Sequence, residues 1–309
     1  MQRPRYRTLV FDSTRWDDFV FRPDDIVITT PPKCGTTWTQ MICALLILQT
    51  PTFDRSLDLI SPWVDMLTRD LASVRADLDA QTHRRFIKTH TPWDGLPHDP
   101  DVTYICVGRD PRDIFLSWDN HWANMNMLAM IGAREQAVGL DDVADLLAQG
   151  PPPRAELEID RFWSWVDDTT PATDTMSLDS TLRHLRSFWD RRDEPNVVML
   201  HYDDLQRDLE GEMRRLAARL GVTVGGDRWP ALVEAATFES MRDRADTIAP
   251  DTTHSIWNDN QQFFHRGCSG QWRDLLDRDA EARYERRIAD LTSPESSAWV
   301  HNGTRSGPD

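Results

Sequence analysis

Lysine is almost absent from this sequence. Of its 35 basic residues, only Lys33 and Lys88 are lysine, and the others are arginine. Both lysines lie in compact motifs, PPKCGTTW at residues 31–38 and IKTHTPW at residues 87–93. An ammonium on a flexible stem can follow a charge that develops during a reaction, whereas a planar guanidinium matches static, bidentate anions. Chance placement of both lysines in compact motifs is improbable, so a functional role at these two positions is favoured over solvated surface lysines.

Long apolar runs and an excess of positive charge are also missing. No run approaches the ~20 residues that cross a bilayer, and residues 1–16 lack the apolar core and cleavage site of a signal peptide. We therefore expect a cytoplasmic protein that is not transmembrane. The net charge of −16 argues against a nucleic-acid partner, because phosphate backbones need a basic face. A small anionic ligand would need a locally positive pocket.

Cysteine is scarce and scattered. The four cysteines show no CxxC spacing, which argues against a zinc site and against a disulfide framework. They are Cys34, Cys43, Cys106 and Cys268. We expect no bound metal.

The hydrophobic pattern predicts an α/β fold with a central parallel sheet flanked by helices. With 309 residues, the chain can form one such domain spanning residues 1–309. Apolar residues at helical spacing follow the first motif, and a second helical pattern at 203–221 ends at Gly221 as its C-cap. Alternating strands and helices place ligands at the carboxyl ends of the strands. The predicted strands are 25–30, 84–90, 102–108 and 196–202.

The middle of the chain, at about 125–179, has a different composition. Residues 149–154 and 167–175 are rich in helix breakers, and a short tryptophan-bearing helix is predicted between them. The segment is either a lid or insertion over the sheet, or simply a longer crossover connection.

The first lysine motif is a strand, a short loop and a helix. Unpaired backbone N–H groups and the helix dipole make such a turn an anion site. Gly35 allows close approach to a phosphate, Thr36 and Thr37 add hydroxyl donors, and Lys33 adds charge. The loop is P-loop-like without being a Walker A motif, because its lysine precedes the glycine and the magnesium-binding Ser/Thr is absent. The alternative is an ordinary loop with a solvated lysine.

The second lysine motif ends a predicted strand. Strand alternation places Lys88 and His90 on one face. A histidine at the ligand edge can act as a general base, because its ordinary pKa lies near neutrality. The alternative is a structural histidine.

Several motifs resemble those of cytosolic-type sulfotransferases. PPKCGTTW resembles their 5′-phosphosulfate loop, KTHTP their catalytic run, and YICVGRDPRDIFLSW their 3′-phosphate motif. HYDDL, TFESM and FHRGCSGQW resemble the later nucleotide-binding segments, and all six follow the family order between residues 29 and 272. Bacterial, and especially mycobacterial, glycolipid sulfotransferases are a particularly close likeness.

The resemblance implies a P-loop-like sulfotransferase fold and 3′-phosphoadenosine 5′-phosphosulfate (PAPS) as donor, without a metal. It implies that Lys33 and Lys88 neutralise the leaving 5′-phosphate while His90 takes the proton of the acceptor hydroxyl. The residues implied to bind the donor are Lys33, Cys34, Gly35, Thr36, Thr37, Trp38, Arg109, Ser117, Tyr202, Phe238, His265, Arg266 and Gly267.

Three positions depart from the family pattern. Cys34 replaces a serine, His265 stands where arginine is frequent, and Gln271 replaces an aspartate. At a helix N-terminus beside Lys33, the Cys34 thiolate is expected to be favoured and reactive. The alternative is a thiol turned into the core.

The acceptor is predicted mainly from the family likeness, as a hydroxyl on a glycolipid, a sterol or a phenol. One set of aromatic and sulfur-bearing residues is expected either to line an apolar cleft or to belong to the core. It comprises Trp118, Trp122, Trp163, Trp165, Met125, Met127 and Met130. The alternative functions are a P-loop-type ATP-dependent kinase and a nucleotide-binding module without catalysis.

Overall fold

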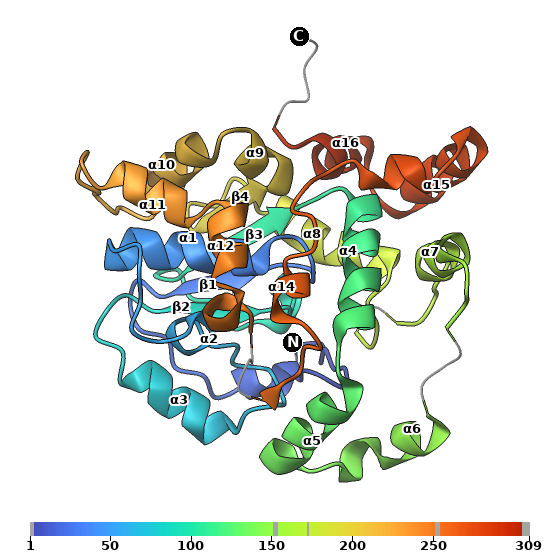
Figure 1. The fold of residues 1–309 in the computed structure, drawn as a ribbon, viewed down its shortest axis with the longest axis horizontal. Helices are drawn as coiled ribbons and strands as arrows, with labels where there is room; N and C mark the ends of the chain where they lie inside the picture. Colours follow the sequence, from blue (N-terminus) through green and yellow to red (C-terminus); the bar gives the residue numbers. More distant parts are fainter. Residues whose placement is uncertain (1–2, 151–153, 172, 251–253, 305–309) are drawn as a thin grey trace.

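The computed structural model describes residues 3–150, 154–171, 173–250 and 254–304. Its centre is a sheet of four parallel strands in the order β2-β1-β3-β4, so the predicted α/β fold is confirmed (Figure 1). Each strand lies within the segment predicted for it and is one to three residues shorter. The strands are β1 (Ile26–Thr29), β2 (Phe86–Thr89), β3 (Thr103–Gly108) and β4 (Val197–His201).

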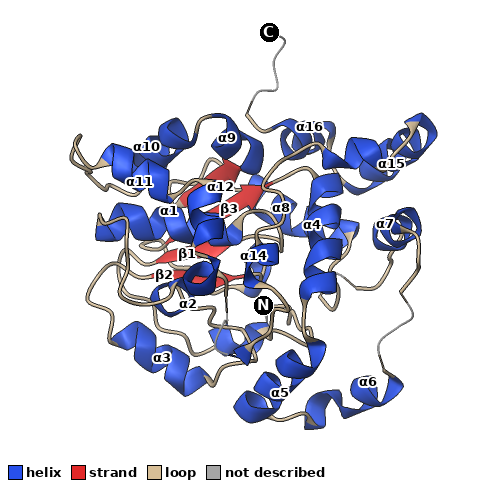
Figure 2. Ribbon diagram, in the orientation of Figure 1, coloured by secondary structure: helices blue, strands red, loops and turns tan. Residues whose placement is uncertain are grey.

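The strands are apolar because helices cover both faces of the sheet. All four residues of β1 are fully buried, and its Ile26 pairs with Phe86 on one side and Thr103 on the other. Helix α1 (Thr36–Leu48) contacts β1 and β2, and helix α8 (Leu178–Trp189) contacts β3 and β4. Right-handed crossovers in opposite directions place these two helices on opposite faces. The sheet therefore lies between helical layers (Figure 2).

The remaining helices surround this centre (Figures 1 and 2). They are α2 (Leu57–Ile60), α3 (Leu71–Asp79), α4 (Pro111–Asn124), α5 (Met127–Val138), α6 (Ala144–Gln149), α7 (Glu158–Val166), α9 (Tyr202–Arg207), α10 (Leu209–Arg219), α11 (Trp229–Ala235), α12 (Phe238–Asp243), α13 (Ala245–Ile248), α14 (Asn260–Phe263), α15 (Arg278–Leu291) and α16 (Pro294–Asn302). Four short 3₁₀ turns are described as well, η1 (Ser13–Trp16), η2 (Trp93–Gly95), η3 (Asp141–Val143) and η5 (Gln271–Asp274). Within the described ranges, no helix is long and apolar enough to span a membrane.

The sheet has a topological switch point between β1 and β3. From β1 the chain moves outward to β2, whereas from β3 it moves in the other direction to β4. The connections leaving β1 and β3 therefore diverge at the carboxyl edge of the sheet and leave a crevice between them, which is where ligands bind in such folds. The PPKCGTTW loop starts at this edge just after β1, and Arg109 lies at the same edge directly after β3.

The prediction of one helix over 203–221 is wrong, although its end is correct. The chain forms α9 and α10, which meet at Asp208, whose backbone is not helical (φ −146°, ψ 74°). The Asp208 carboxylate accepts a hydrogen bond from the Gly211 N–H at 2.9 Å and so starts a second helix. Gly221, with φ +65°, ends α10, and the Val222 N–H bonds back to the Ala217 carbonyl at 2.8 Å.

The segment at 125–179 contains α5, η3, α6, α7 and the start of α8. Residues 151–153 and 172, within its two breaker-rich stretches, lie outside the described residues. Arg134 of α5 is completely buried, and its Nε donates a hydrogen bond to the Leu9 carbonyl at 3.1 Å. The segment is thereby joined to the N-terminal part of the chain.

Gly108, at the end of β3, provides a test of how closely α16 packs against the sheet. A Cβ at Gly108 would lie 2.4 Å from Cη2 of the buried Trp299 in α16. We expect Gly108→Ala to lower the free energy of unfolding by about 1–3 kcal/mol, the usual cost of overpacking. Urea denaturation measures this change.

Gly132→Ala, in the interior of α5, is the matched control. No described atom lies within 4 Å of a Cβ at this position, and alanine favours helix over glycine by about 0.5–1 kcal/mol. If both variants showed the same stability change, close packing of Trp299 against Gly108 would be refuted.

Candidate active site

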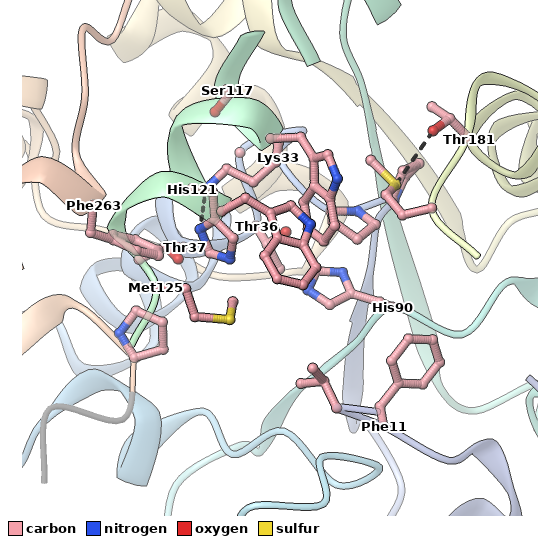
Figure 3. A pocket seen from close by; sticks show the side chains of 18 of the residues that line it. Phe11, Lys33, Thr36, Thr37, His90, Ser117, His121, Met125, Thr181 and Phe263 are labelled. Atoms are coloured by element: carbon pink, nitrogen blue, oxygen red, sulfur yellow. Dashed lines mark hydrogen bonds between the residues drawn. The ribbon is translucent and has the colours of Figure 1, made fainter. Parts of the chain in front are cut away.

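A cavity of about 500 Å³ lies at the carboxyl edge of the sheet (Figure 3). It brings together every residue expected at the site except Cys34. These residues are Lys33, Gly35, Thr36, Thr37, Trp38, Lys88, His90, Arg109, Ser117, Tyr202, Phe238, His265, Arg266 and Gly267. They come from loops and helices that follow all four strands and from the segment after α14.

The loop after β1 has an unusual backbone that directs its groups into the cavity. Lys33 and Gly35 both have positive φ, +71° and +95° respectively. Gly35 is also the N-cap of α1, so the unpaired N–H groups of the first helical turn begin here. A Cβ at Gly35 would lie 3.0 Å from the Tyr202 ring, so a side chain there would be crowded as well as strained.

Lys33 is in contact with neutral partners. Its Nζ lies 3.0 Å from Nδ1 of His121 and 4.8 Å from the centre of the Phe263 ring (Figure 3). Burial, together with the positive charges of Arg109 and Lys88, lowers the pKa of Lys33 to about 7. The cavity therefore holds a cation whose charge an anionic ligand would stabilise.

His90 is held in the form that a general base requires. Its Nδ1 lies 2.8 Å from the Thr30 carbonyl, and because a carbonyl only accepts, Nδ1 carries the proton. Burial, and next the charge of Lys88, lowers the pKa of His90 well below its usual value. The imidazole is then neutral, and its Nε2 has a free lone pair.

Trp63 connects His90 with Lys88. The His90 ring meets the Trp63 ring edge-on at 4.7 Å, and the ammonium of Lys88 lies 4.2 Å from the centre of the same ring. The predicted shared face of Lys88 and His90 is therefore present. Sequence reasoning missed Trp63, because no local pattern indicates that it lies beneath the second motif.

A buried carboxylate fixes the backbone around His90. Asp65 accepts hydrogen bonds from the hydroxyls of Thr89 and Thr91, at 2.7 and 2.6 Å. These threonines flank His90 in the sequence and are completely buried. Asp65 was also missed, since only the fold brings it to the end of β2.

Aromatic rings form a second wall of the cavity. Trp38 meets Tyr202 edge-on at 5.3 Å, and its Nε1 donates to the Ala236 carbonyl at 2.8 Å. Phe238 packs on Gly267, where a Cβ would lie 2.2 Å from its ring. Three rings from distant segments thus line the cavity, and aromatic rings of this kind can pack against a planar base.

Arg109 links the loop after β1 with the segment after α14. Its Nη1 donates to the Lys33 carbonyl at 3.0 Å, its Nη2 to the Cys268 carbonyl at 3.3 Å, and its guanidinium lies 4.1 Å from the Tyr202 ring centre. Its buried Nε has no hydrogen-bond partner among the described residues. The bonds to the two carbonyls use two of the five N–H donors of the guanidinium.

The loop with His265 and Arg266 lies at the exposed end of the cavity. Both side chains are exposed, and Arg266 donates to Gln271 Oε1 at 3.3 Å. Asp113 of α4, which the sequence analysis did not single out, anchors this loop by accepting from the Gly270 and Gln271 N–H groups at 2.6 and 3.0 Å. Burial, and next the charge of Arg266, lowers the pKa of His265, which leaves most of the positive charge here on Arg266.

The expected reactivity of Cys34 is wrong. Its side chain is completely buried in the core and does not line the cavity. Burial raises the pKa of the Cys34 thiol, and the charge of Arg109 only partly opposes this. Sequence showed that Cys34 lies near a helix N-terminus, but it did not show the direction of the Cβ. That direction is set by the left-handed backbone of Lys33 and Gly35.

The expected acceptor residues divide into two groups. Trp118, Trp122, Met125, Met127 and Met130 line the cavity. Trp163 and Trp165 do not, because α7 packs them against the core and against Arg283.

The wall is completed by segments that carry no motif. The N-terminal stretch 6–11 lines it together with residues 173–176, and the Arg7 N–H donates to the Thr173 carbonyl at 2.8 Å. Trp257 and Phe263 contribute from the chain after α13.

Known proteins share this sequence pattern. The sulfotransferase domain family matches residues 23–294. A glycolipid sulfotransferase of Mycobacterium bovis (strain BCG / Pasteur 1173P2) is 42% identical over 314 residues, covering 97% of this chain and 94% of that protein. Sulfotransferase 1E1 of Homo sapiens is 23% identical, covering 90% of this chain and 89% of that protein. The chain belongs to the sulfotransferase family, as its motifs predicted.

Solved structures share the fold. Retinol dehydratase in complex with androsterone and inactive cofactor PAP has a TM-score of 0.68 at 20% identity, covering 92% of this chain and 86% of that chain. A mouse sulfotransferase complexed with PAP has a TM-score of 0.66 at 17% identity, covering 92% and 90%. With the family established by sequence, the protein is an enzyme that transfers sulfuryl groups, and this function is favoured over the kinase and the non-catalytic module.

The burial of three cysteines gives a direct prediction. Cys268 is exposed, whereas Cys34, Cys43 and Cys106 are buried with thiol pKa values that burial raises. We expect iodoacetamide to modify Cys268 first and the other three at least about tenfold more slowly, because only thiolates react. Mass spectrometry of the folded enzyme measures the rates, and labelling in denaturant shows that all four thiols are available. Fast labelling of Cys34 would contradict the buried position.

Proposed function

We propose that the enzyme transfers a sulfuryl group from PAPS to a hydroxyl of an apolar acceptor. One observation carries the proposal: two lysines and a neutral histidine with a free Nε2 face the same cavity as the aromatic wall. The lysines and the histidine suit transfer chemistry, and the aromatic wall suits a nucleotide. The absence of a metal requirement remains a prediction.

The residues present fit this donor. The side chains of Arg109, Ser117 and Arg266 would hold the 3′-phosphate. The N–H groups of residues 34–37, including that of Cys34, would hold the 5′-phosphosulfate with Thr36, Thr37 and Lys33. Trp38, Tyr202 and Phe238 would enclose the adenine, with His265 and Gly267 beside it. The PAP named in the two related structures supports the same choice of nucleotide.

The residues of this chain then have separate tasks in the transfer. The bond from sulfur to the bridging phosphate oxygen breaks while the bond from sulfur to the acceptor oxygen forms. Lys33 and Lys88 stabilise the negative charge that develops on the departing phosphate. His90 accepts the proton of the acceptor hydroxyl at Nε2, while its Nδ1 proton keeps the ring oriented on Thr30.

The acceptor half of the cavity favours an apolar molecule. Its wall consists of methionine and tryptophan side chains from 118–130 and of the stretch 6–11. The related glycolipid sulfotransferase supports a glycolipid, and sterols or phenols are the alternatives from the same class. We include in the proposal that residues 125–179 form a lid over this half of a single domain, and that the enzyme acts in the cytoplasm.

Transfer is tested with [³⁵S]PAPS and a lipid extract as acceptor, using His90→Asn as the diagnostic variant. Asparagine can still donate to Thr30 but has no equivalent of Nε2, so we expect transfer to fall by at least about 10²-fold, at the lower end of general-base contributions. Affinity for adenosine 3′,5′-bisphosphate should change little, because a base acts in the transition state. Transfer within a few-fold of the parent would remove His90 from the mechanism.

Donor affinity is expected to depend on pH through Lys33. In the free enzyme its lowered pKa, about 7, means that Lys33 is charged below this pH and neutral above it. A bound phosphate favours the charged form, so binding takes up a proton above pH 7. We expect the Kd of adenosine 3′,5′-bisphosphate, measured by calorimetry, to rise by up to about tenfold per pH unit between pH 7 and 9.

The Lys33→Arg variant is the control for this pH dependence. A guanidinium stays charged throughout the range, so its binding curve is expected to be flat between pH 7 and 9, whatever its absolute affinity. The same slope in both proteins would assign the titration to another group.

A further inference from the structure

Lys33 is constrained at three points. Its backbone has φ +71°, a region that non-glycine residues adopt only where the surroundings impose it. Its carbonyl accepts a hydrogen bond from Arg109 at 3.0 Å. Its Nζ lies 3.0 Å from Nδ1 of His121, and Figure 3 shows this contact inside the cavity. A flexible four-carbon side chain is thus fixed from its backbone to its ammonium.

His121 lies on α4, one helical turn after Ser117. Its ring stacks on Trp118 at 5.6 Å and contacts Trp257 at 4.6 Å, so its orientation is fixed by packing. Burial, and next the charges of Lys33 and Lys88, lowers the pKa of His121 well below its usual value. The ring is neutral, and its Nδ1 accepts a hydrogen from the ammonium while the proton stays on Nε2.

We propose that His121 is a positioning residue for sulfuryl transfer, which accepts a hydrogen bond from Lys33 and holds its ammonium in place for the donor. This inference rests on the proposed function. The ammonium has three N–H groups, so two remain for the phosphosulfate oxygens. An ordered side chain also loses less conformational freedom when the donor binds.

A neutral acceptor suits this task better than a carboxylate. An aspartate or glutamate beside Lys33 would cancel the charge that the donor needs and would repel its phosphates. The imidazole of His121 fixes the direction of the ammonium and leaves its charge available. Helix α4 thus supplies Ser117, which is expected to contact the nucleotide, and His121, which acts on the nucleotide through Lys33.

The test compares two variants of nearly equal shape, His121→Asn and His121→Leu. Both lose the stacked ring, but only asparagine keeps an acceptor near the position of Nδ1. We expect Asn to bind adenosine 3′,5′-bisphosphate within about twofold of the parent. We expect Leu to bind about three- to tenfold more weakly than Asn, the usual effect of one unrestrained flexible side chain. Calorimetry at pH 6.5 measures both.

The same pair in a Lys33→Met background shows whether His121 acts through Lys33. In that background the difference between Asn and Leu is expected to vanish. A difference that persists would mean that His121 touches the nucleotide directly, and it would overturn the proposal. Equal binding in the parent background would make His121 a packing residue, and tighter binding by Leu would make it a competitor of the donor. Either result also overturns the proposal.

Two further measurements keep the result interpretable. Thermal unfolding of each variant reports its folding. If the Leu variant does not fold, His121→Phe keeps an aromatic ring without the acceptor and is compared with the parent, with the same expected weakening. If the parent itself does not bind adenosine 3′,5′-bisphosphate, the proposed function fails, whereas binding by the parent with no effect at His121 refutes only this inference.

Discussion

The reversal of strand order between β1 and β3 is the constraint on which the site depends. Because the two connections leave the sheet in opposite directions, a crevice opens at its carboxyl edge. Arg109 spans that crevice and donates to the carbonyl of Lys33, so the position of the loop after β1 is tied to β3 as well as to β1. Lys33, Lys88 and His90 are brought together at this junction, since each lies at or just beyond the end of a strand.

An acidic protein with a net charge of −16 concentrates cations at this junction. Lys33 contacts an imidazole and a phenyl ring, Lys88 lies over the indole of Trp63, and Arg109 donates to two carbonyls. Neutral contacts orient these cations without cancelling their charge. Burial, and next the charges of Arg109 and Lys88, lower the pKa of Lys33, and an anionic ligand would oppose this shift.

Local sequence patterns predicted the parts of the molecule that local physics decides. Buried apolar runs predicted all four strands, and Gly221 predicted the end of α10. The scarcity of lysine drew attention to two segments that line the same cavity. The break at Asp208 was missed because the helical pattern continues across it, while the capping bond to Gly211 depends on the folded backbone. The direction of the Cys34 side chain depends on that geometry too.

Local sequence patterns could not reveal the residues that hold Lys33 and His90 in place. His121 lies 88 residues after Lys33 in the sequence, and Asp65 lies 25 residues before His90. His121 contacts Lys33 because α4 packs beside the loop after β1. Asp65, which lies before β2 in the chain, contacts the residues at the end of β2. Sequence thus predicted residues that line the cavity, and the fold revealed the residues that hold them in place.

Most of the proposed acceptor wall is built from chain outside the motifs, and Trp118 is the exception. The stretch 6–11, bonded to Thr173 and to Arg134, forms one side, and the methionines of 125–130 form another. Substitutions there change the shape of the cavity without touching the loop, the lysines or His90. Two enzymes of this family can therefore share every motif residue and still act on different molecules. Under the proposed function, changes in the stretch 6–11 or in residues 125–130 would alter which acceptor fits, while the groups of the transfer chemistry stayed the same.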